Sequence, residues 1–213
     1  NDEDFIKSMG LESRKARLQS LPSRISAEIV HGVTLSTMHG CPPDEIEKIC
    51  CYMLEEKHLN TFVKLNPTLL GFNRVREILD TCGFEYLIVK QESFDHDLKL
   101  DRAKEMLHRL RALAAEKKLQ FGVKLTNTLG SVNNKGVLPG EEFYMSGRAL
   151  FPLSINVAAV LSREFNGDLP ISYSGGASLY NIKDIFDCGI RPITMATDLL
   201  KPGGYGRMLE CVK

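Results

Sequence analysis

The sequence has no excess of charge of either sign and no long uninterrupted apolar run. Its 27 lysines and arginines balance its 27 aspartates and glutamates, so composition gives no electrostatic argument for binding nucleic acid or a membrane surface. The most apolar window, residues 149–161, is short and contains Pro152 and Asn156, which excludes a membrane span. We therefore expect a cytoplasmic protein with neither a nucleic-acid nor a membrane partner.

Paired-cysteine motifs are also missing. The six cysteines include no C-x-x-C pair, and no histidine stands at ligand spacing from them, so no metal site is expected in this chain. We interpret most of these residues as reduced thiols that are buried or incidental. They are Cys41, Cys50, Cys51, Cys82, Cys188 and Cys211.

The chain does have a regular alternation of apolar runs and amphipathic stretches. Its 213 residues, 43% apolar and 25% charged, suit one soluble domain or a fragment of a larger one. The helical stretches between consecutive strands favour a parallel sheet with right-handed crossovers. The predicted fold class is α/β, of the (β/α)8 TIM-barrel type. Six parallel strands are expected, at residues 33–38, 61–65, 84–90, 120–126, 170–173 and 192–195.

Six strands are two short of a closed barrel. We predict a peripheral helical arm over residues 1–30 and the C-terminal three-quarters of a TIM barrel over residues 31–213. The missing strands are expected to precede residue 1, because loops of the phosphate-binding type follow the last two strands of this chain. The open sheet edges would be covered by those strands, by a second copy or by residues 1–30.

The stretch that organises the chain is residues 169–197, a predicted strand–helix–strand unit. Ser174-Gly175-Gly176 follow its first strand, and Ala196-Thr197-Asp198 follow its second. Glycines at a strand end let backbone N–H groups approach an anion, and the last two βα-loops of such barrels often bind phosphate. The unit therefore predicts a phosphate site for a cofactor or a phosphorylated substrate.

Polar side chains recur at other strand ends. Val63-Lys64, Val89-Lys90 and Val123-Lys124 place a lysine near the end of three predicted strands. Strands buried on both faces rarely tolerate lysine unless it meets an anion, so the repeat indicates a positive pocket; alternatively, some of these side chains extend toward solvent between the helices. Thr126-Asn127-Thr128 could bind the edge of a planar heterocycle, or form an ordinary turn.

Four further features have weaker interpretations. His39 could be a general acid or base or a loop residue, and Cys41 is a candidate nucleophile without a clear partner. We interpret Asp95-His96-Asp97 as a solvated loop rather than a metal site. Residues 129–146 are rich in Gly, Asn and Pro and are expected to be a long irregular connection, such as a lid or binding loop.

A family resemblance rests on motifs after residue 120. The order and spacing of Thr126-Asn127-Thr128, Ser146-Gly147, Pro152, Pro170-Ile171 and Gly175-Gly176 resemble the FMN-binding barrel of the dihydropyrimidine and dihydroorotate dehydrogenases. The sequence is more similar still to the barrel region of a selenate reductase subunit, a bacterial flavin and iron–sulfur protein. The resemblance implies a domain of a multidomain oxidoreductase in which FMN exchanges electrons with a small planar or oxyanion substrate. Iron–sulfur clusters and FAD or NAD(P) would belong to other domains of the full protein.

The resemblance also implies roles for individual residues. Lys90 matches a lysine at the pyrimidine end of the flavin, while Asn127 and Thr128 match the polar pair that orients the substrate. With Lys90 these form the implied catalytic set. The implied cofactor-binding residues are Lys90, Thr126, Gly147, Gly175, Gly176, Ala196 and Thr197.

Two departures from the family pattern keep alternatives open. The family's N-x-S-C-P motif corresponds here to residues 64–70, which contain no cysteine. Asp198 would repel a phosphate unless its side chain turns away or caps the following helix. A non-catalytic barrel scaffold, or a barrel that binds a phosphorylated metabolite without redox chemistry, is therefore also compatible with the sequence.

Overall fold

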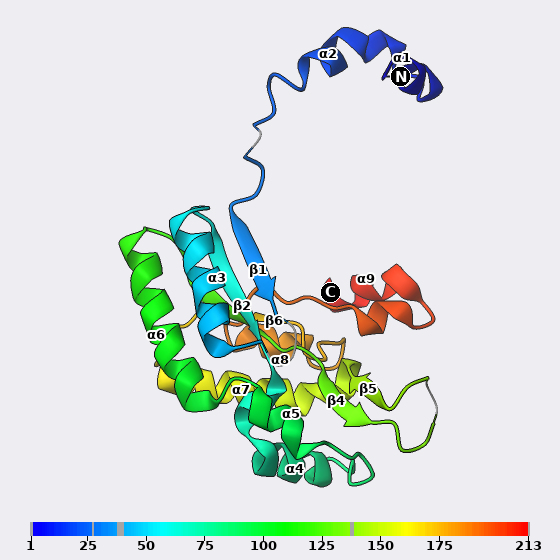
Figure 1. Cartoon of the computed structure of the whole chain (residues 1–213). Helices are drawn as coiled ribbons and strands as arrows, with labels where there is room; N and C mark the ends of the chain where they lie inside the picture. The colour runs from blue at the N-terminus through cyan, green and yellow to red at the C-terminus, as the bar shows by residue number, and fades with distance from the viewer. Residues whose placement is uncertain (1, 27, 38–40, 137–138, 213) are drawn as a thin grey trace. The chain divides into compact units, whose positions relative to one another are not determined.

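The computed structural model describes residues 2–26, 28–37, 41–136 and 139–212, and Figure 1 shows their elements. Internal contacts divide the chain into two units, residues 1–31 and residues 32–213. The first unit contains three short helices: α1 (Asp2–Ser8), η1 (Glu12–Arg14) and α2 (Lys15–Ser20). An exposed ion pair of 2.6 Å joins Lys15 Nζ to Glu3 Oε1 within it.

The second unit is built on a parallel sheet of four strands. These are β1 (Gly32–Ser36), β2 (Asn60–Leu65), β3 (Phe121–Leu125) and β6 (Ile171–Tyr173), hydrogen-bonded in the order β1-β2-β3-β6. One face of the central strands is buried in the core, where Val63 and Val123 are fully buried, whereas residues of the other face such as Lys64 and Lys124 are half-buried. Beyond β6, Ile193 continues the sheet through a single parallel bridge to Tyr173.

The strand predicted at residues 84–90 is wrong. These residues form a turn and an irregular segment, and β2 pairs directly with β3. The Arg76 guanidinium binds the carbonyl oxygens of Leu87 and Phe84 at 2.6 and 2.9 Å, which satisfies groups that a neighbouring strand would otherwise pair. The apolar residues of the segment instead join a second core cluster with α4 (Phe72–Thr81). The strand predicted at residues 192–195 is likewise reduced to the bridge at Ile193.

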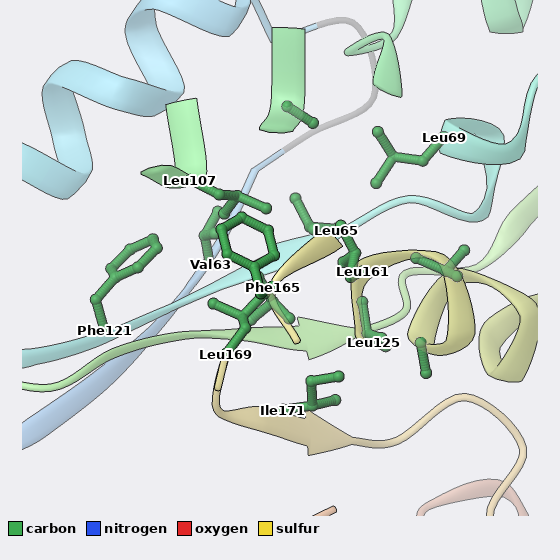
Figure 2. Close-up of a cluster of buried hydrophobic side chains, with 14 of the residues drawn as sticks. Val63, Leu65, Leu69, Leu107, Phe121, Leu125, Leu161, Phe165, Leu169 and Ile171 are labelled. Atoms are coloured by element: carbon green, nitrogen blue, oxygen red, sulfur yellow. The ribbon is translucent and has the colours of Figure 1, made fainter. Parts of the chain in front are cut away.

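Helices cover the sheet and supply its main core. Figure 2 shows Val63, Leu65, Leu125 and Ile171 of the sheet packed with Leu107 and Leu161 of two helices and with Phe165, which directly follows the second helix. Those helices are α6 (Leu100–Glu116) and α7 (Phe151–Glu164). The other helices are α3 (Pro43–Glu55), η2 (Pro67–Leu70), α5 (Gln91–His96), η3 (Gly147–Leu150), α8 (Ile182–Asp187), η4 (Thr197–Leu200), η5 (Gly204–Gly206) and α9 (Arg207–Val212).

The irregular connection predicted at residues 129–146 contains a hairpin. Strands β4 (Leu129–Val132) and β5 (Glu142–Met145) pair in antiparallel register. Leu129 and Met145 face each other in that register and are both buried, so the ends of the segment are held by packing.

None of the helices in the described part of the chain is long and apolar enough to cross a membrane.

Candidate functional site

A cavity of about 300 Å³ lies where β2, β3 and β6 end, and we call it the strand-end cavity. Five stretches supply its walls: β2, the segment through and after β3, the η3 region, the loop after β6, and residues 194–197. Its lining residues are Lys64, Lys124, Thr126, Thr128, Ser146, Gly147, Leu150, Ser174, Gly176, Ala177, Thr194, Met195, Ala196 and Thr197.

Two lysines give the cavity its charge. Lys64 and Lys124 are paired residues of neighbouring strands, so their side chains leave the sheet on the same face. Neither forms an ion pair with a described residue, and no described carboxylate lines the cavity. Burial lowers the pKa of Lys64, and burial together with the charge of Lys64 lowers the pKa of Lys124. The cavity is therefore positively charged and partly desolvated.

Close backbone packing shapes the opposite wall. Gly176 has a φ of +81°, and a Cβ there would lie 2.5 Å from the Gly147 carbonyl oxygen and 2.8 Å from the Phe151 nitrogen. A Cβ on Gly147, whose φ is +67°, would lie 2.8 Å from Cγ2 of Thr197. Three loops thus meet at positions that leave no room for a side chain on either glycine, and Gly147, Gly176 and Thr197 line a backbone-walled recess that we call the cradle.

Gly175 has a different role from Gly176. A Cβ on Gly175 would lie 1.9 Å from Ser154 Oγ, in α7. That Oγ is itself 2.7 Å from Thr126 Oγ1, a buried contact that ties α7 to the end of β3. Gly175 therefore allows close helix–loop packing and does not line the cavity.

The carboxylate of Asp198 is held by two cations. Its side chain is only 6% exposed, with Oδ1 3.3 Å from Arg148 Nη2 and 3.2 Å from Lys201 Nζ. Burial by itself would raise the pKa of Asp198, but the hydrogen bonds and charges of Lys201 and Arg148 lower it overall. Because its charge is compensated, the repulsion that the sequence suggested at the phosphate loop is removed.

Asn127 belongs to a polar network that joins three strand ends. Its Nδ2 donates to Asn66 Oδ1 at 2.8 Å, and its Oδ1 accepts from Ser36 Oγ at 3.1 Å. Asn66 Nδ2 and Thr68 Oγ1 both donate to Asp97 Oδ2, at 3.0 and 2.8 Å. Asp97 is buried, so the interpretation of its segment as a solvated loop is wrong for this residue.

The structure brings together most of the residues proposed from the sequence. Thr126, Thr128, Gly147, Gly176, Ala196 and Thr197 line the strand-end cavity, whereas Asn127, Gly175 and Lys90 are not among its lining residues.

Lys90 does not end a strand. Its Nζ lies 2.6 Å from Glu142 Oε1, and this contact with Glu142 raises the pKa of Lys90. The site residues proposed from the family resemblance did not include Lys64 and Lys124, which are the charged residues of the cavity lining. The repeated Val-Lys pairs had nevertheless indicated both.

The remaining candidates among the described residues do not line this cavity. His39 lies outside the described residues. Cys41 is half-buried, and burial together with the nearby Glu45 raises the pKa of its thiol, which disfavours a nucleophilic thiolate. All six cysteines are free. Within the described ranges, no cluster of histidine, cysteine and acidic side chains could hold a metal ion.

Comparison with known proteins identifies the family. A family model described as "Oxidoreductase YgfK, N-terminal TIM-barrel domain" matches residues 3–213. The chain belongs to this YgfK family. Two curated relatives, each named "Putative oxidoreductase YgfK" and from Escherichia coli strains K12 and O157:H7, are 74% identical over 212 residues, which is all of this chain and 20% of theirs. The chain thus spans about a fifth of the length of these YgfK relatives.

Family membership confirms the predicted fold class, an α/β fold of the TIM-barrel type, in an N-terminal domain of an oxidoreductase family. Among solved structures, dihydroorotate dehydrogenase (DHODH) of Eimeria tenella in complex with ferulenol is similar, with a TM-score of 0.41 and 17% identity. That match covers 79% of this chain and 53% of the other.

Proposed function

We propose that this domain is the FMN site of a longer flavin and iron–sulfur oxidoreductase, related to a selenate reductase subunit. The observation that supports it is a positive cavity with a backbone cradle on one wall, two lysines on another and no described carboxylate between them. That donor set suits a ligand with one anionic group and a ring that gains negative charge when it is reduced. FMN, when bound, would supply the electron transfer.

The residues have separate tasks in this proposal. The backbone of Gly147 and the hydroxyl of Thr197 would hold the phosphate, and Gly176 would keep the space beside them clear of a side chain. Lys124 takes the place that the resemblance gave to Lys90, because it lies in the cavity and on β3, the direct neighbour of β6. Its ammonium would stabilise negative charge on a reduced ring. Thr128 supplies a hydroxyl donor to a planar substrate, and Asn127 fixes the strand end through its network.

The rest of the proposal concerns the longer protein. Because the curated relatives are about five times as long as this chain, the electron donors would be iron–sulfur and FAD or NAD(P) domains elsewhere in the protein. Further barrel strands would also come from outside this segment. A small planar or oxyanion substrate would bind at the strand ends, and six free thiols are in keeping with a cytoplasmic location.

The test is the visible absorption spectrum of the full-length protein with and without added FMN. We expect bound flavin in the wild type and in Lys90→Ala, because Lys90 lies outside the cavity. We expect its loss in Gly176→Asp, which fills the cradle and adds a negative charge, and weakened binding in Lys124→Met. Absence of flavin from the wild type under every condition would overturn the proposal.

One observation favours a second candidate function. Each end of the Asn127 amide forms a hydrogen bond within the protein, so the strand ends rather than a substrate ring fix its orientation. A barrel that binds a phosphorylated metabolite needs only the cradle and the lysines. Binding of sugar phosphates without any flavin spectrum would support that candidate, and absence of both ligands would support a non-catalytic scaffold.

A further inference from the structure

A row of polar side chains crosses the sheet one level below the strand ends. Ser36, Lys64 and Lys124 are paired in register along β1, β2 and β3, and Ser172 of β6 continues the row. Neighbouring strands are about 4.8 Å apart, so the two lysines are direct neighbours with the same orientation. The charge of Lys64 acts on Lys124, whose pKa it lowers together with burial.

The two lysines lie at different distances from the glycine loop, because the strands follow the order β1-β2-β3-β6. Lys124 lies on the strand that adjoins β6, whose end carries the glycine loop, and Lys64 lies one strand further from that loop. A phosphate in the backbone cradle therefore leaves Lys64 as the more remote positive group. Both side chains are half-buried, and no described carboxylate pairs with either.

An unpaired, partly buried ammonium destabilises a fold unless a ligand compensates it. The cavity that Lys64 lines contains hydroxyl groups, glycines, apolar side chains and Lys124, but no described carboxylate that would compensate its charge. Burial also lowers the pKa of Lys64, and a bound anion would reverse this effect by favouring the charged form.

We propose that Lys64, with Lys124 beside it, forms a second anion subsite in the strand-end cavity, which binds a small oxyanion or carboxylate substrate next to the cofactor. This inference rests on the proposed function, because it gives the substrate class for the same site. The ammonium of Lys64 binds the negatively charged group of the substrate, and the ammonium of Lys124 contacts both the substrate and the cofactor.

Brief amine acylation of the full-length protein, read by mass spectrometry, tests the subsite directly. Sulfate and acetate serve as the two anion probes, with chloride at equal ionic strength as the control, and Lys183 reports general reactivity because its side chain is 81% exposed. We expect sulfate, acetate or both to slow acylation of Lys64 severalfold relative to chloride, in the presence and absence of FMN. Protection by sulfate would indicate a site for a tetrahedral oxyanion, and protection by acetate would indicate a site for a carboxylate.

The same experiment separates this inference from the proposed function. Protection of Lys64 by an anion when no FMN binds would leave the subsite in place and overturn the flavin assignment. Bound FMN with no anion protection, or complete protection of Lys64 by FMN alone, would overturn the subsite.

A matched pair of variants provides an independent measurement. A ligand that binds only the native protein stabilises it increasingly as its concentration rises above Kd, and sulfate also stabilises proteins nonspecifically through exclusion from their surface. Sulfate should therefore raise the thermal midpoint of the wild type and of Lys90→Met above the chloride value. We expect the increase to be smaller in Lys64→Met than in Lys90→Met, because only the nonspecific part remains. That variant should fold, because it replaces a half-buried charge by an apolar side chain of similar length. An unchanged sulfate effect in Lys64→Met would contradict the proposal.

Discussion

Gly176 combines a left-handed backbone with a close backbone approach, and the two effects can be separated. Its φ of +81° is matched by Gly83, whose φ is +80° but where an added Cβ would have no atom within 4 Å. We expect Gly83→Ala to reduce the free energy of unfolding by about 1 kcal/mol from backbone strain alone. Gly176→Ala should lose about 1–3 kcal/mol more, because its Cβ meets the Gly147 carbonyl and the Phe151 nitrogen.

Urea unfolding of the two variants measures the difference. Equal losses in Gly176→Ala and Gly83→Ala would show that the three loops can separate at little cost, and that the cradle is not closely packed in solution.

Individual site residues were predictable where the sequence pattern that indicated them lies on a strand that forms in the structure. The Val-Lys pairs marked Lys64 and Lys124 because both lie on strands that form. The same pattern failed for Lys90, since the Arg76 side chain binds the carbonyls of its segment. The Asn127 network was also beyond prediction, because its partners Asn66 and Ser36 come from the ends of other strands.

At the scale of elements, Asp198 joins η3 to η4. Arg148 belongs to η3, whereas Asp198 belongs to η4 and Lys201 follows it. Asp198→Asn leaves two cations without their shared carboxylate. We expect it to lower the free energy of unfolding at pH 7 by about 2–3 kcal/mol. Asp187→Asn is the control, because its ion pair with Lys183 is solvent-exposed and should contribute less than about 1 kcal/mol.

The pH dependence of this effect follows from the lowered pKa of Asp198. A carboxyl whose pKa is lower in the folded protein contributes stability above its ordinary pKa, and the contribution is lost as the pH falls through the folded value. The stability difference between wild type and Asp198→Asn should therefore shrink as the pH falls below about 4. A difference that stays constant between about pH 7 and about pH 3 would show that the ion pairs contribute nothing.

Elements were predictable where short apolar runs alternate with helical stretches. The runs at β1, β2, β3 and β6 indicated a parallel sheet, and all four strands form. The β4–β5 hairpin was missed because glycine, asparagine and proline dominate residues 129–146, whereas its pairing depends on the buried contact of Leu129 with Met145. Tertiary packing, rather than local propensity, decided that segment.

At the scale of the whole molecule, the sheet has an open side. Among the described residues, β1 pairs only with β2, and an exposed parallel edge is a site for further pairing. We expect the amides of β1 that do not bond to β2 to be protected from hydrogen exchange in the full-length protein, where further strands are proposed. Residues 1–213 alone should exchange these amides faster. Equal, rapid exchange in both would contradict closure of the barrel at this edge.

The direct pairing of β2 with β3 has a consequence for insertions and deletions. Residues 66–120 form an excursion between two neighbouring strands, so a change of length within residues 84–90 should leave the lysine row aligned. Deleting one residue inside β2 would do the opposite. Because side chains alternate along a strand, every later side chain would change face, and Lys64 would turn from the cavity toward the helices. The tolerance of this domain to altered chain length should therefore differ sharply between two segments that lie close together in the sequence.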